Sequence, residues 1–225
     1  MEEETRTNIQ KWKSARKWRV TASVFGSICK ATERKDLGKL CKSMYNPPDL
    51  NVPSIRHGRT YESKALKVFS EKTGKTILKS GLCVLPELPF LGATPDAFVQ
   101  NEDAVCEVKC PYKARKCNIS PEHIDFLEEK NGKIRLKRNN NYFYQIIGQM
   151  KLSGKSHCYF IVYTFEDMFY EKIALDDAFF TEKMLPKLSS FYDNEYCPFV
   201  ASALGKKGPK TCSREEHNSS ILGKK

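Results

Sequence analysis

Apolar residues recur every three or four positions in two early stretches of the chain, which is the spacing of one helix face. The first stretch, residues 12–31, predicts a helix with a break near Val20, where neighbouring hydroxyl side chains can cap a new start. The second predicts a helix over residues 54–73 that ends at Gly74, because glycine readily takes the left-handed conformation common at helix ends. Residues 1–10 begin with acidic residues and lack this pattern, so they are predicted to be a frayed N-terminus.

Apolar runs of strand length follow, separated by further helical patterns. Strands are predicted at about 76–85, 90–99, 103–109, 133–138, 157–165 and 168–174, and helices at about 121–130, 142–152 and 176–193. This order predicts an α/β fold in which a mixed central β-sheet is flanked by helices, built as one domain over residues 11–197. Residues 198–225 are rich in Gly, Lys and Ser and are predicted to be a basic, disordered tail.

The charge of the chain narrows the choice of partner. With 38 basic and 27 acidic residues its formal net charge is +11, which favours a polyanion, most commonly nucleic acid. No stretch approaches the roughly 20 apolar residues of a membrane span, and the acidic start is unlike a secretory signal. The nine cysteines are therefore expected to be reduced thiols of an intracellular protein, nuclear in a eukaryotic host and cytoplasmic otherwise. Their spacings do not predict a zinc or iron–sulfur cluster.

Two short carboxylate motifs in the middle of the chain suggest chemistry. Asp96 and Glu107 are expected on adjacent strands of a hairpin, and Lys109 follows on the same face as Glu107, since strand side chains alternate. On a surface these charges would be ordinary solvated groups. Their flanks are apolar, however, and a charge on a buried strand is costly unless it is paired or metal-bound. Two carboxylates converging with an amine can hold a divalent metal and activate water, so a metal-dependent nuclease site is predicted.

Five short motifs stand in one order along the chain at spacings that suit one nuclease domain. They are Trp12-x3-Arg16-x4-Thr21-Ala22-Ser23, Gly58-x3-Glu62, Thr94-Pro95-Asp96, Glu107-Val108-Lys109-Cys110-Pro111 and Tyr144-Gln145-x3-Gln149. This set resembles the PD-(D/E)xK nuclease superfamily. More closely, it resembles the YqaJ-like viral recombinase family, which includes the phage lambda-type alkaline exonuclease. The resemblance covers about residues 12–165 and implies the nuclease core fold.

The resemblance also implies a role for each matching residue. The implied catalytic residues are Glu62, Asp96, Glu107, Lys109 and Gln145. Asp96, Glu107 and the carbonyl oxygen of Val108 would ligate one or two Mg²⁺ ions, with Mn²⁺ as a substitute. Glu62 would assist a metal or its water. Lys109 would orient or deprotonate the attacking water or stabilise the transition state, and whether it is the general base is left open. For Gln149, four residues after Gln145, a hydrogen bond from helix to sheet is preferred to a catalytic role.

Two groups of residues are expected to bind DNA. By the resemblance, Arg16 and Ser23, with Thr94 where the phage enzyme has serine, would bind the phosphate at a DNA 5′ end, which suits a guanidinium fork and hydroxyl donors. The strand at 133–138 alternates basic with apolar residues, which predicts a basic face for the DNA backbone. The residues of that face are Lys133, Arg135 and Lys137.

These inferences together predict a metal-dependent deoxyribonuclease, a 5′→3′ exonuclease acting on duplex ends in recombination or repair. An endonuclease or nickase with the same site, a catalytically inactive DNA-binding module and an adaptor protein are the alternatives. DNA is the expected partner, and no membrane is. The resemblance adds a single-strand annealing protein and a homo-oligomer. The long stretch between Glu107 and Gln145 leaves open whether the ring-shaped trimer of the phage enzyme is retained.

Overall fold

A five-stranded mixed β-sheet forms the centre of the computed structural model, which describes residues 1–48 and 51–205. Its strands, in spatial order, are β2 (Ile77–Lys79), β4 (Ala97–Val99), β5 (Ala104–Lys109), β8 (His157–Tyr163) and β9 (Met168–Ala174). Strands β5 and β8 run parallel, and the other neighbours pair antiparallel. The predicted mixed central sheet is confirmed.

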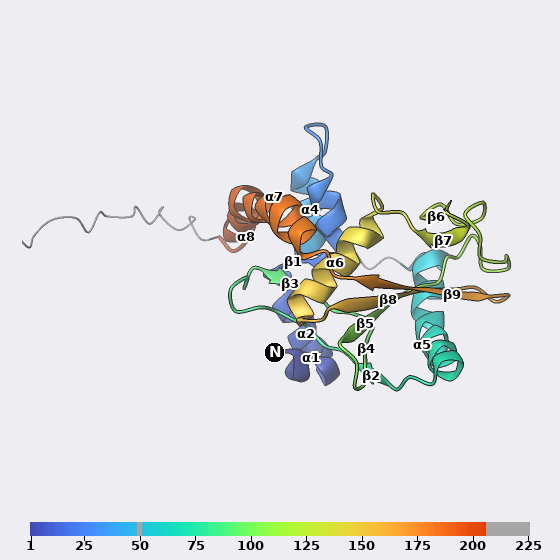
Figure 1. Cartoon of the computed structure of the whole chain (residues 1–225). Coiled ribbons are helices and arrows are strands. Elements are labelled where there is room, and N and C mark those ends of the chain that lie inside the picture. Colours follow the sequence, from blue (N-terminus) through green and yellow to red (C-terminus); the bar gives the residue numbers. More distant parts are fainter. Residues whose placement is uncertain (49–50, 206–225) are drawn as a thin grey trace, which may run out of the picture.

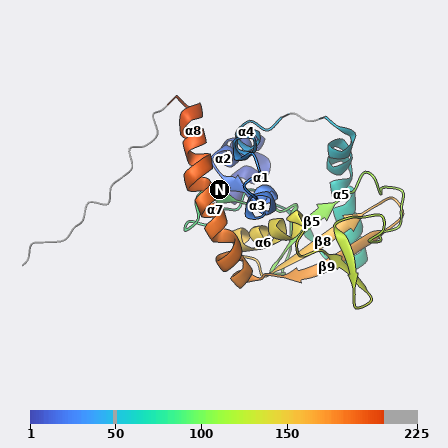
Figure 2. The ribbon, with the colours of Figure 1, turned by 90° about the horizontal axis from the view of Figure 1, so that it is seen from above.

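Helices cover both faces of this sheet. Helix α5 (Pro53–Thr73) lies on one face and α6 (Asn141–Ser153) crosses the other (Figure 1). Seen from above, α3 (Phe25–Cys29) and α7 (Leu185–Phe191) lie on the same side as α6, away from α5 (Figure 2). The predicted end of α5 is also confirmed, because Gly74 is left-handed with a φ of 68°.

The alternation of side chains along β5 decides what each face of the sheet receives. Cys106 and Val108 pack with Ala65 of α5, whereas Val105 joins the larger core that contains α6. Glu107, between two residues of the α5 face, therefore points toward α6.

Two predicted strands are shorter than the apolar runs that suggested them. The run at 90–99 divides into β3 (Leu91–Gly92), which pairs in parallel with β1 (Val20–Thr21), and β4 in the main sheet. Pro95 lies in the gap and has no N–H to donate to a sheet. The run at 76–85 keeps only β2, and beyond it Cys83 forms a single bridge to Ala93.

The helix predicted at 121–130 is wrong. Residues 127–136 form a hairpin of β6 (Leu127–Lys130) and β7 (Lys133–Leu136). Its turn is Asn131-Gly132, with φ angles of 53° and 70°, and positive φ at both central residues is what a tight hairpin turn requires. Strand pairing across this turn therefore overrides the weak helical pattern of the preceding residues.

Two helical regions were missed or cut short by the sequence analysis. Helix α4 (Leu37–Tyr45) falls where no element was predicted. The helix predicted at 176–193 continues through π-helical turns at Phe179–Met184 and Tyr192–Tyr196 into α8 (Cys197–Ala203). The prediction of disorder from 198 is therefore wrong up to residue 205, and the remainder of the predicted tail lies outside the described residues. Within residues 1–48 and 51–205, no helix has both the length and the apolar character to cross a membrane.

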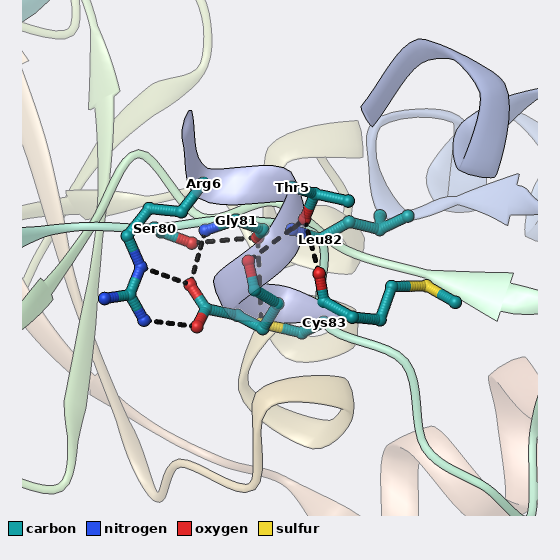
Figure 3. A network of polar contacts seen from close by, with 8 residues as sticks. Thr5, Arg6, Ser80, Gly81, Leu82 and Cys83 are labelled. Carbon is teal, nitrogen blue, oxygen red and sulfur yellow. Dashed lines mark hydrogen bonds and ion pairs between the residues drawn. The ribbon is translucent and has the colours of Figure 1, made fainter. Parts of the chain in front are cut away.

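The N-terminus is ordered, which corrects the prediction of a frayed start. Helix α1 (Glu2–Thr7) lies against residues 80–83, as Figure 3 shows. The Glu2 carboxylate accepts from the Gly81 N–H (2.6 Å), and the Thr5 hydroxyl accepts from the Leu82 N–H (2.7 Å). A Cβ atom at Gly81 would lie 2.0 Å from the Glu2 carbonyl oxygen, so only glycine permits this approach. The anchor is distant in sequence, which is why a local pattern did not indicate it.

Helix α2 (Ile9–Lys17) follows α1 and buries none of its residues. It is instead held by directed contacts. The Asn8 side chain caps its start, and the Tyr196 hydroxyl donates to the Lys17 carbonyl at its end (2.6 Å). The helix and the break after it match the predicted break near Val20, where β1, a 3-10 turn (Ala22–Val24) and α3 follow.

Candidate active site

Asp96 is fixed beside β5 by its own backbone and side chain. It precedes β4 directly, and its N–H donates to the carbonyl of Cys106 (3.0 Å). Its Oδ2 accepts from the N–H of Val108 (2.7 Å). The carboxylate therefore lies next to the strand that carries Glu107 and Lys109, as the predicted hairpin requires.

Glu107 is a buried carboxylate that accepts hydrogen bonds from three side chains. It is 2% exposed, and donors from both β5 and α6 reach it. Its Oε1 accepts from Lys109 Nζ (2.5 Å) and Gln145 Nε2 (2.6 Å), and its Oε2 accepts from Gln149 Nε2 (2.7 Å). Hydrogen bonds to an ionised group are roughly twice as strong as neutral ones, so this set holds the carboxylate in one orientation.

Gln149 is the site residue to which the sequence analysis gave too little weight. It is 1% exposed and lies one turn after Gln145 on α6. The helix-to-sheet hydrogen bond that was preferred does exist, but its acceptor is Glu107 itself, and the amide also approaches the Thr94 carbonyl (3.4 Å). Its Oε1 has no hydrogen-bond partner within the part of the chain that the structure describes. The spacing of four from Gln145 was the signal available in the sequence.

Lys109 is a donor in this arrangement. Burial by itself would lower the pKa of its ammonium, but the charges of Glu107 and Asp96 outweigh burial and raise that pKa above its ordinary value. The Tyr142 ring adds a further favourable contact, with its centroid 4.2 Å from Nζ. Lys109 is therefore protonated here and can donate to a negatively charged oxygen.

Three carboxylates, those of Glu62, Asp96 and Glu107, lie close enough to disfavour one another's ionisation. Burial raises the pKa of Asp96 well above its ordinary value, and the charges of Glu107 and Glu62 raise it further. Burial and the Glu107 charge likewise raise the pKa of Glu62 on α5, although Lys109 opposes this. Carboxylates that resist ionisation in one another's presence are stabilised by a cation, and one lysine does not supply enough charge.

The donor set suits a hard divalent cation. Carboxylate and carbonyl oxygens are the ligands that Mg²⁺ prefers, and it keeps several of its waters, so few protein ligands suffice. Among the described residues, no three side chains of His, Cys, Asp or Glu already converge on one point. Glu107 nevertheless keeps acceptor capacity, because a carboxylate has about four acceptor positions and the three donors here leave one of them open. Asp96, Glu107 and the Val108 carbonyl remain the residues that could hold the ion.

A basic cavity, called here the Arg16 cavity, lies beside this site. It encloses about 690 Å³, and Arg16 and Ser23 both line it. The Arg16 guanidinium stacks 4.3 Å from the centroid of the Trp12 ring, and burial lowers its pKa from the ordinary value. Thr94 does not line the cavity, but its hydroxyl accepts from Trp12 Nε1 (3.1 Å), which leaves its own O–H free to donate.

The basic face predicted on the 133–138 strand is only partly available. Lys133 is exposed near the hairpin turn. Arg135 pairs with Glu128 (2.6 Å), and Lys137 donates to the carbonyl of Asp125 (2.6 Å). Contact of these residues with DNA stays a prediction, and Arg135 would have to leave its partner to make it.

Comparison with known proteins relates these observations to a family. A model of the YqaJ-like viral recombinase domain matches residues 11–156, which include every residue of the site described above. No curated protein matches the sequence significantly.

Solved structures share the fold. The chain is similar to the alkaline exonuclease LHK-Exo from Laribacter hongkongensis, with 24% identity and a TM-score of 0.67 over 87% of this chain and 97% of that one. A complex of LHK-Exo with dAMP gives 25% identity and a TM-score of 0.66, covering 87% of this chain and 99% of that one. A phage-related exonuclease from Haemophilus somnus 129PT shares 13% identity with a TM-score of 0.61, and the match covers 83% of this chain and 96% of that one. The SOX protein of KSHV, in a complex with RNA, shares 12% identity with a TM-score of 0.57, and the match covers 91% of this chain and 76% of that one.

Proposed function

This chain belongs to the YqaJ-like viral recombinase domain family, and on that basis we propose that it is a metal-dependent 5′→3′ exonuclease acting on DNA duplex ends. Its likeness to alkaline exonucleases supports a DNA nuclease. The observation that carries the proposal is the buried Glu107 carboxylate, bound by Lys109, Gln145 and Gln149. A surface carboxylate would not need such a set of donors. A role in recombination or repair, with an annealing protein as partner, is part of the proposal.

The residues divide the work of hydrolysis among them. Asp96, Glu107 and the Val108 carbonyl would hold Mg²⁺, which supplies Lewis acidity toward the phosphate and toward water. Lys109, held as an ammonium by the neighbouring carboxylates, donates to a phosphoryl oxygen on which charge grows. Gln145 is half-buried and orients the attacking water or the phosphate, whereas the buried Gln149 fixes Glu107.

The strand end is recognised in the Arg16 cavity. Arg16 and Ser23 line it together and suit a terminal phosphate dianion. The free energy that burial costs the Arg16 guanidinium is recovered when an anion binds there. LHK-Exo, a relative in fold, binds dAMP, a nucleotide that carries such a phosphate. An anchored end positions the next phosphodiester over the carboxylates, which is the geometry of an exonuclease.

Digestion of matched DNAs tests this function. Purified protein is given linear duplexes with a 5′ phosphate or a 5′ hydroxyl, and closed circles, with Mg²⁺ or with chelator. We expect the phosphorylated linear duplex to be cut fastest, closed circles to persist, and chelator to stop all cutting. Glu107→Gln should abolish cleavage, whereas Glu122→Gln, at an exposed position, should not. Prompt cutting of closed circles would instead support an endonuclease with the same carboxylates.

A further inference from the structure

One turn of helix α5 contributes a residue to the lining of each of two cavities. Arg59 lines the Arg16 cavity. Gly58, the preceding residue, lines a second cavity of about 890 Å³ that is also lined by Lys109, and this is called here the Lys109 cavity. Glu62 lies three residues after Arg59 on the same helix, and residues three apart are neighbours on a helix surface. Arg59 therefore lines the Arg16 cavity and is also a helix neighbour of the Glu62 carboxylate.

The Arg16 cavity carries more positive charge than one terminal phosphate requires. Its lining includes five basic side chains and no acidic one, and the basic ones are Lys13, Arg16, Lys17, Arg19 and Arg59. Within residues 1–48 and 51–205, none of these five forms an ion pair. A terminal phosphate supplies a charge of at most about −2. A ligand with a second negative group fits this lining better than a single phosphate does.

Arg59 differs from the other four cations in its position. The others come from α2 and the residue pair that follows it, a different segment from the helix that carries Glu62. Arg59 alone of the five comes from α5, the helix that carries Glu62, whose charge acts on Asp96. If the ligand carries a second phosphate, Arg59 is the cation of this lining placed to bind it near the carboxylates.

We propose that Arg59 binds the phosphodiester that is cut, from the side opposite Lys109, while Arg16 binds the terminal phosphate. This inference rests on the proposed exonuclease function. A planar guanidinium can give two parallel hydrogen bonds to one phosphate, and its charge acts on oxygens that become more negative in the transition state. Arg59 is exposed, so it can take this position without breaking an existing ion pair in the described part of the chain.

The same helix offers a matched control. Arg56 lies three residues before Arg59, is also exposed, and lines neither cavity. Arg56→Ala changes the net charge and the helix surface as much as Arg59→Ala does, but it removes no side chain from the lining of either cavity. Because both arginines are exposed, thermal unfolding of each alanine variant should match the wild type, which separates loss of function from loss of fold.

The experiment measures single-turnover cleavage of linear duplexes with a 5′ phosphate or a 5′ hydroxyl. Losing a hydrogen bond to a charged group should slow Arg59→Ala by about 10- to 100-fold on both ends alike, so its preference for the phosphorylated end is retained. Arg59→Lys should recover part of the rate, and Arg56→Ala should stay within about twofold of wild type. Arg16→Ala should instead reduce the preference for the 5′-phosphorylated duplex over the 5′-hydroxyl duplex.

Two outcomes would overturn the proposal. If Arg59→Ala is no slower than Arg56→Ala, Arg59 does not contact the cut phosphodiester. If Arg59→Ala loses the end preference as Arg16→Ala does, it belongs to the terminal-phosphate site instead. A wild type without end preference would refute the proposed polarity, yet the comparison of Arg59→Ala with Arg56→Ala on the same DNA would still decide the role of Arg59.

Discussion

Replacing Asp96 with asparagine should stabilise the metal-free fold while abolishing cleavage. The carboxylate lies beside Glu107 and near Glu62, and burial and both charges raise its pKa from an ordinary value of 3.8. The folded protein therefore binds more protons than the unfolded chain across the window from about pH 4 up to the raised pKa. Within that window the free energy of unfolding falls as pH rises. Asparagine keeps an acceptor for the Val108 N–H and removes the charge.

The size of the effect follows from this linkage. Removing a poorly compensated charge from a buried site typically gains about 1–3 kcal/mol. For a protein of this size, about 2–4 °C per kcal/mol predicts that Tm rises by about 2–12 °C. The gain should be near zero at pH 4 and grow as the pH rises toward the raised pKa of Asp96. Saturating Mg²⁺, at about 100 times its Kd, should return about 2.7 kcal/mol to the wild type and much less to Asp96→Asn.

Thermal unfolding in chelator at several pH values, repeated with Mg²⁺, measures these quantities. Asp103→Asn is a control of opposite sign, because hydrogen bonds from Ser156 and the charge of Lys155 lower the pKa of Asp103, so its loss should destabilise the protein above pH 4. A lower Tm for Asp96→Asn than for wild type at high pH in chelator would refute the argument that crowded negative charge marks this site.

Three further predictions concern the rest of the site. Gln149→Met should lower the free energy of unfolding by about 1–3 kcal/mol in denaturant titration and also slow cleavage, because a buried donor to Glu107 is lost; unchanged cleavage would limit Gln149 to the fold. Lys133→Ala with Lys137→Ala should lower the slope of log DNA affinity against log salt by about 0.9 for each phosphate contact, without changing the rate of the bound complex. An unchanged slope would mean that the hairpin does not touch DNA. Mn²⁺ should replace Mg²⁺ in cleavage assays, whereas Ca²⁺, larger and less rigid in its geometry, should support binding with little turnover.

The arrangement of the candidate site could be predicted because it depends on short-range rules. Period-two alternation places Glu107 and Lys109 on one face of β5, and a spacing of four places Gln149 beside Gln145. What alternation cannot state is which element covers that face. The contact between Gln149 and Glu107 requires α6 to pack there, and this is a property of the whole fold.

The errors arose where distant residues decide local structure. Helix α1 is held by hydrogen bonds to Gly81 and Leu82, which a local pattern does not contain. The hairpin was the avoidable error, because Asn131-Gly132 between strand-forming runs is a strong turn signal. The continuation into α8 depends on packing near Tyr196, a buried residue. Composition alone did not separate this segment from a disordered tail.

The way helix α2 is held has a consequence for how this enzyme type can diverge. Helix α2 carries Arg16 but has no fully buried residue, so its position depends on α1, on Trp12 and on the hydroxyl of Tyr196. The family match begins at residue 11, which leaves α1 outside the shared segment. Substitutions in α1 can therefore shift Arg16, the proposed binder of the strand end, while the carboxylates stay in place. If the proposed roles hold, substrate preference and hydrolytic chemistry depend on different segments of the chain, so a new end specificity can evolve in α1 and α2 without loss of the carboxylates.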